Sequence, residues 1–105
     1  MPRANPGEVW IVDLGLAAKT RPCLILSEYP KEDELALITV LAHTTAVRNS
    51  RWELPIRTSY LKTGVFHLQQ VQSVPIARLQ RRIGELSGEE LRLVRATLSR
   101  FLRLE

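Results

Sequence analysis

The sequence predicts a mainly β protein, a small barrel of five or six short antiparallel strands followed by one C-terminal helix. Short β-branched and apolar runs, separated by polar or proline-containing segments, recur over residues 8–76. The apolar spacing then changes to a helical period over residues 88–103. A chain of 105 residues fits one domain, so we predict a single domain over residues 1–105.

The first two predicted strands flank a short loop. Residues 8–14 alternate their side chains between two faces and are rich in β-branched and aromatic residues, which is typical of a strand. Residues 15–20 form the predicted loop. Residues 22–28 are a short apolar run that predicts a second strand with both faces covered. Its Pro22 lacks an N–H and suits the first position of that strand.

Three further segments complete the predicted β region. Residues 35–43 form the third strand, residues 51–56 the fourth, and residues 65–76 one or two more. Pro55 indicates that the fourth strand lies at an edge or carries a bulge, because proline removes a ladder hydrogen bond. Polar loops join these segments.

The predicted helix has a clear start signal. Ser87 and Glu90 have the S-x-x-E spacing of a capping box, in which each side chain satisfies a backbone N–H of the other residue. The apolar residues that follow fall at helical spacing on one face, namely Leu91, Val94, Leu98, Phe101 and Leu102. We therefore expect this face to lie against the core or a second subunit.

The chain is basic, with a net charge of +4 and a pI of about 9.8. Arginines account for twelve of the fifteen basic residues. The planar guanidinium matches phosphate geometry and stacks on bases, whereas lysine is a compact point charge. The composition therefore favours a polyanionic partner, either nucleic acid or an acidic protein segment. A solvated surface without a specific partner is the alternative.

Other classes are disfavoured by composition. Cys23 is the single cysteine, which excludes an intrachain disulfide and a cysteine-based zinc site. With only two histidines, we predict no metal and no cofactor. The first residues contain no apolar signal-peptide core, and no apolar stretch approaches the roughly 20 residues that span a bilayer. We expect a cytoplasmic protein that does not associate with membranes.

The residues with chemical potential lie at the predicted strand ends. Arg21 precedes the second strand, Thr44 follows the third within a His-Thr-Thr run, and His67 lies on the fifth. If these ends meet in one groove, arginine stabilises charge on a phosphoryl group, threonine donates a hydrogen bond and histidine transfers a proton. Such a set cleaves RNA without metal, because RNA carries its own nucleophile, the 2′-hydroxyl. Taken singly, Arg21 also fits a surface cation, Thr44 a loop cap and His67 a packed histidine.

Further residues are predicted to contact nucleic acid around that groove. They are Lys19, Thr45, Arg48, Gln69, Gln70 and Gln72. Arg78, Arg81 and Arg82 form either a nucleic-acid patch or a solvated charge cluster.

Five segments, in this order, resemble the MazF/PemK family of type II toxin–antitoxin endoribonucleases: "GEVWIVDL" (7–14), "RPCLILS" (21–27), "VLAHTT" (40–45), "LQQVQSVP" (68–75) and "RRIGELSGEELRLVRATLSRFLRL" (81–104). The resemblance covers nearly the whole chain. It implies an SH3-like barrel that forms a homodimer and cleaves single-stranded RNA without metal at a short sequence, leaving 2′,3′-cyclic phosphate and 5′-hydroxyl ends. By position, Arg21 matches the catalytic arginine of the family, and Thr44 matches its catalytic threonine.

The resemblance also implies a cognate antitoxin. We expect it to be acidic and partly disordered, and to thread into the basic groove so that RNA is excluded.

The sequence departs from the family pattern at the proton-transfer position. Some relatives have an arginine and an acid where His67 and Gln69 stand, and the loop over residues 15–20 lacks the Glu or His that many relatives have before R-P. A glutamine is no general base, so His67 is expected to take the acid/base role.

Two alternatives to an endoribonuclease are compatible with the same fold. One is an RNA- or protein-binding module with weak or no catalysis, which the missing acid favours. The other is a gyrase poison like CcdB, against which the R-P-x-L-I-L-S and H-T-T stretches argue.

Overall fold

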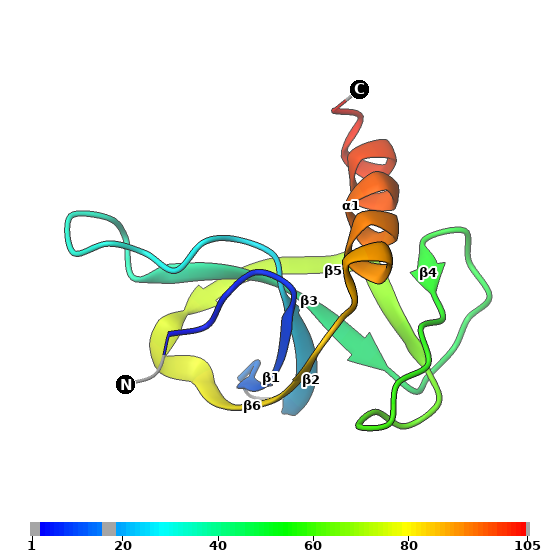
Figure 1. Ribbon diagram of the computed structural model, residues 1–105, viewed down its shortest axis with the longest axis horizontal. Coiled ribbons are helices and arrows are strands. Elements are labelled where there is room, and N and C mark those ends of the chain that lie inside the picture. Colours follow the sequence, from blue (N-terminus) through cyan, green and yellow to red (C-terminus); the bar gives the residue numbers. More distant parts are fainter. Residues whose placement is uncertain (1–2, 16–18, 105) are drawn as a thin grey trace.

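The computed structural model describes residues 3–15 and 19–104, so residues 16–18 of the predicted loop lie outside the described residues. The elements run along the chain as β1 (Glu8–Asp13), β2 (Thr20–Ile25), β3 (Leu37–Thr44), β4 (Glu53–Leu54), β5 (Val65–Pro75), a short 3₁₀ turn (Ile76–Arg78), β6 (Leu79–Glu85) and α1 (Gly88–Leu102). Figure 1 shows a strongly bent sheet with α1 standing at one side of it. The prediction of a mainly β fold with one C-terminal helix is therefore confirmed.

The strands form one antiparallel sheet in the order β4-β5-β3-β2-β1-β6. Among the described residues β4 and β6 do not pair with each other, so the predicted closed barrel is too strong a description. A barrel closes only when its first and last strands pair, and β4 is just two residues long. The bend comes from β5, whose pairing with β3 shifts register between Leu41 and His43.

Two predicted strand boundaries need correction, and one further strand was not predicted. The fourth strand shrinks from residues 51–56 to Glu53–Leu54, where Pro55 stops it. The second begins at Thr20, so Pro22 is its third residue, and the ladder with β3 starts one residue later at Cys23. The last strand, β6, lies beyond the predicted β region, because its sequence LQRRIGE has too few apolar residues to signal a strand.

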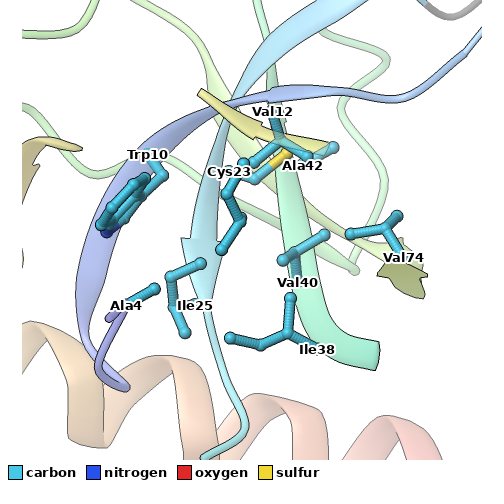
Figure 2. Close-up of a cluster of buried hydrophobic side chains, with 10 residues drawn as sticks. Ala4, Trp10, Val12, Cys23, Ile25, Ile38, Val40, Ala42 and Val74 are labelled. Atoms are coloured by element: carbon cyan, nitrogen blue, oxygen red, sulfur yellow. The ribbon is translucent and has the colours of Figure 1, made fainter. Parts of the chain in front are cut away.

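Each face of the sheet carries a buried core cluster. One core cluster, drawn in Figure 2, includes Trp10, Cys23 and Val40. The other cluster lies under α1 and includes Val9 and Leu24. Along the chain, Val9 is next to Trp10 and Leu24 is next to Cys23. Successive strand residues point to opposite faces, so one strand supplies both clusters. This explains why the second strand is apolar throughout, as predicted.

The helix begins with the predicted capping box. The Glu90 N–H donates to Ser87 Oγ at 3.1 Å, and the Ser87 N–H donates to Glu90 Oε1 at 2.8 Å. The helix ends at Leu102, because Arg103 has a left-handed backbone with φ of 57°. Val94 anchors the inner face of α1 in the core and is fully buried. Within the described part of the chain, no helix has the length and apolar character needed to cross a bilayer.

Candidate functional site

A basic cleft opens where the start of β2 and the end of β3 meet the middle of β1, the middle of β6 and the loop before β5. We call this space of about 490 Å³ the basic cleft. Its walls are made by Ile11, Thr20, Arg21, Pro22, His43, Thr45, Tyr60, Leu61, Lys62, Arg81 and Ile83. Antiparallel register builds the floor, because Ile11 of β1 is paired with Pro22 of β2 on one side and with Arg81 of β6 on the other.

The charge lining the cleft is entirely positive. Arg21, Lys62 and Arg81 contribute to its walls, and no carboxylate does so among the described residues. Charges of one sign that line a hollow concentrate counter-ions of the opposite sign there. The cleft therefore suits a phosphate-bearing ligand.

Arg21 and Thr44, the two residues that match the catalytic positions of the resembled family, lie at neighbouring strand ends. Cys23 of β2 is paired with Ala42 of β3, and Arg21 and Thr44 each lie two residues beyond this pair, near the start of β2 and at the end of β3. Thr44 is nearly buried, and its Oγ1 accepts a hydrogen bond of 3.0 Å from the Ala46 N–H. A hydroxyl that accepts still has its proton to donate. Thr44 is not among the residues that line the basic cleft, whereas Thr45 is.

His43 lines the cleft and is buried. Its ring meets Phe66 edge-on, with the ring centroids 5.1 Å apart. Its Nε2 atom has no hydrogen-bond partner among the described residues. Burial lowers the pKa of His43 below its usual 6.5, so the imidazole is neutral at pH 7. Sequence reasoning considered His43 as part of the His-Thr-Thr run but ranked it below His67, because its only signal is its place beside the Thr-Thr pair.

Gly64 lets the chain pass close to this strand end. A Cβ at residue 64 would collide with the carbonyl oxygen of Thr44 and come within 2.9 Å of the His43 ring. The glycine thus fixes how closely the loop before β5 approaches both residues.

His67 lies elsewhere, on β5 beside β4. Its Nε2 is 3.7 Å from Glu53 Oε2, and its Nδ1 accepts from the Gln69 N–H at 3.3 Å. The Glu53 carboxylate also accepts from the backbone N–H groups of Arg48 and Ser50. Burial raises the pKa of Glu53, but these backbone hydrogen bonds and the nearby His67 outweigh it, so the pKa is lowered overall. His67 is not among the residues that line the basic cleft.

The other predicted nucleic-acid-binding residues differ in their relation to the cleft. Thr45 lines it. The remaining five are exposed and are not among its lining residues, namely Lys19, Arg48, Gln69, Gln70 and Gln72. The structure also places Tyr60 and Lys62 in the cleft wall, and the sequence offers no periodic or motif signal for them because they lie in an irregular loop.

Comparison with known proteins identifies the family of this chain. The sequence of residues 5–102 matches the model of the PemK-like, MazF-like toxins of type II toxin–antitoxin systems. The chain therefore belongs to this toxin family. A comparison with curated protein sequences gives no match.

Solved structures with the same fold come from the same family. MazF-mt6, a Mycobacterium tuberculosis toxin, is 27% identical with a TM-score of 0.78, covering 93% of this chain and 98% of that chain. An endoribonuclease in complex with its cognate antitoxin from a mycobacterial species is 22% identical with a TM-score of 0.79, covering 97% of both chains. A MazE–MazF complex from Deinococcus radiodurans is 18% identical with a TM-score of 0.80, also covering 97% of both.

Proposed function

We propose that this toxin is an endoribonuclease that cleaves single-stranded RNA at a short sequence, leaving 2′,3′-cyclic phosphate and 5′-hydroxyl ends. One observation carries the proposal: Arg21 stands at the wall of a cleft that is lined by cations and by no carboxylate among the described residues. Family membership adds support, since one structural relative is an endoribonuclease.

The proposed reaction is a transesterification within the RNA. The 2′-oxygen attacks phosphorus and loses its proton to a base, while the 5′-oxygen leaves and gains a proton from an acid. Negative charge builds on the two non-bridging oxygens, and the Arg21 guanidinium stabilises that charge. The Thr44 hydroxyl donates to one of these oxygens and orients the phosphate. The nucleophile is supplied by the substrate, so the chain contributes positioning, charge and proton transfer.

The proton-transfer group is one of two histidines. The sequence favours His67, because some relatives have an acid where Gln69 stands and a glutamine is no general base. The geometry favours His43, which lines the basic cleft, whereas His67 is engaged by Glu53 and Gln69 outside it. An unpartnered buried nitrogen such as His43 Nε2 costs roughly 1–3 kcal/mol, and a bound substrate oxygen would remove that cost. We assign the proton transfer to His43 and retain His67 as the rival to be tested.

We further propose a homodimer and an acidic antitoxin. A homodimer is what the resemblance to the toxin family implies, and membership of that family supports it. Two structural relatives are complexes with their antitoxins. An acidic chain would fill the basic cleft and exclude RNA, and its affinity would fall as salt rises.

The test is cleavage of mixed-sequence single-stranded RNA in EDTA, with analysis of the product ends. Native protein should give cyclic-phosphate ends, and Arg21→Ala and Thr44→Ala should each abolish them. Arg92→Ala, an exposed change on α1 away from the cleft, is the matched control and should cleave normally. RNA that binds but stays intact across a broad sequence pool would instead favour a non-catalytic binding module. Inhibited gyrase supercoiling without RNA cleavage would favour a gyrase poison.

A further inference from the structure

A second basic pocket lies apart from the basic cleft, between the turn before β4 and the C-terminal end of α1. It encloses about 540 Å³ and is lined by Arg51, Trp52, Arg100, Phe101 and Arg103. We call it the arginine–aromatic pocket. Figure 1 shows β4 and α1 side by side, and the contact between Trp52 and Phe101 joins them.

The aromatic part of the pocket is a fixed platform. The Trp52 and Phe101 rings meet edge-on at 66°, with centroids 5.1 Å apart, and both side chains are half-buried. The Arg51 guanidinium lies over the indole of Trp52, 4.6 Å from the ring centroid. A guanidinium stacked on an indole presents a flat cationic surface, which is a surface on which bases stack.

The charges of the three pocket arginines are not neutralised by ion pairs with other described residues. Among the ion pairs between described residues, none involves Arg51, Arg100 or Arg103. The arginine side chains are also not needed to cap the helix, because the Ser99 and Arg100 carbonyls already accept from the N–H groups of Leu104 and Arg103. No carboxylate lines the pocket within the described chain. Three like charges around one hollow repel one another, and a bound anion relieves that repulsion.

The pocket is separate from the basic cleft. The two share no lining residue. The N-terminal end of α1 follows β6, which supplies Arg81 and Ile83 to the cleft, whereas the arginine–aromatic pocket lies at the other end. A helix of 15 residues is about 22 Å long at 1.5 Å per residue. A ligand in this pocket is therefore not the nucleotide at Arg21.

We propose that the arginine–aromatic pocket is a second binding site, one that takes a nucleotide of single-stranded nucleic acid. The base stacks on the Arg51–Trp52 surface, and Arg100 and Arg103 hold the phosphate. Positive charge alone would also suit an acidic peptide. The platform of stacked guanidinium and indole favours nucleic acid, because stacking on aromatic rings and arginines is the usual way that single strands are bound without sequence preference.

The test is direct binding with a probe that the proposed cleavage reaction leaves intact. A short single-stranded oligodeoxyuridylate lacks the 2′-hydroxyl, and its binding is followed by tryptophan fluorescence. Trp10 is almost completely buried, so quenching reports on Trp52, and Trp52→Phe should abolish it. The double variant Arg100→Ala/Arg103→Ala should weaken binding roughly tenfold or more, and it should reduce the salt slope by about 0.7 for each phosphate that is no longer neutralised.

The matched control is Arg92→Ala/Arg95→Ala, which removes the same charge from exposed positions of the same helix outside the pocket. It should leave quenching and affinity close to native. Equal weakening by both double variants would overturn the proposal, because general charge would then explain binding. Absence of quenching by the oligonucleotide, or quenching only by an acidic peptide, would also overturn it. Quenching without RNA cleavage would support this site while the proposed nuclease function fails.

Discussion

The Nε2 atom of His67 lies 3.7 Å from Oε2 of Glu53, and both side chains are buried where β4 and β5 pair. The same carboxylate accepts hydrogen bonds from the Arg48 and Ser50 backbone N–H groups. Glu53 therefore ties β5 to the loop that follows Thr44. This gives His67 a structural role that the sequence pattern does not reveal.

Replacing Glu53 with Gln should destabilise the protein and change its acid sensitivity. The folded pKa of Glu53 lies below the usual 4.5, so its stabilising contribution is complete above that value and is lost as pH falls through the folded pKa. Thermal unfolding measured from neutral pH to about pH 3 should show a lower native Tm in acid. The variant should start lower at neutral pH and lose less on acidification. Parallel curves for both proteins would contradict this role.

His43 and His67 can be separated by their effects on the pH–rate profile of RNA cleavage. Burial lowers the pKa of His43, so as a base its activity should rise with pH below 6.5 and level off above it. His43→Ala should remove this rise together with most of the rate, roughly 10²–10⁴-fold. His67→Ala should keep the shape of the profile. If instead His67→Ala removes the rise and His43→Ala does not, the proton transfer belongs to His67.

Gly64→Ala should disturb the strand end that carries His43 and Thr44. The added methyl group collides with the Thr44 carbonyl oxygen, so the loop or the strand must move, at a cost of about 1–3 kcal/mol. Stability in urea and RNA cleavage should both be impaired. Gly88→Ala is the control, because its new Cβ meets nothing closer than 3.5 Å and alanine suits a helix. Native stability in Gly64→Ala would show that the close approach is unimportant.

Ser87→Ala should weaken the start of α1. It removes the side chain that accepts from the Glu90 N–H, and such caps contribute about 0.5–2 kcal/mol. For a domain of this size, each kcal/mol lowers Tm by about 4–8 °C. Differential scanning calorimetry measures the shift, with Ser59→Ala, an exposed loop change, as the control. An unchanged Tm in Ser87→Ala would mean that packing of the helix alone fixes its start.

Much of the fold was predictable because its signals are local. Alternation within residues 8–14 and the capping box at Ser87 depend on side chains close together in sequence, and both are confirmed. The missed strand β6 has few apolar residues, and its pairing with β1 at long range, not its own propensity, makes it a strand. Closure of the sheet depends likewise on whether distant edges meet, which no local pattern reports.

The sequence by itself determined the fold class, the family and the basic, arginine-rich character of the protein. Composition, periodicity and motif order can all be read along the chain, without knowing which distant residues meet. The tertiary structure alone decided which residues share a cleft. Antiparallel register and the shift between Leu41 and His43 bring His43 and Thr45 to the wall beside Arg21, and they leave His67 against Glu53. A register shift reassigns side chains between faces, so two histidines that look alike in the sequence lie in different surroundings.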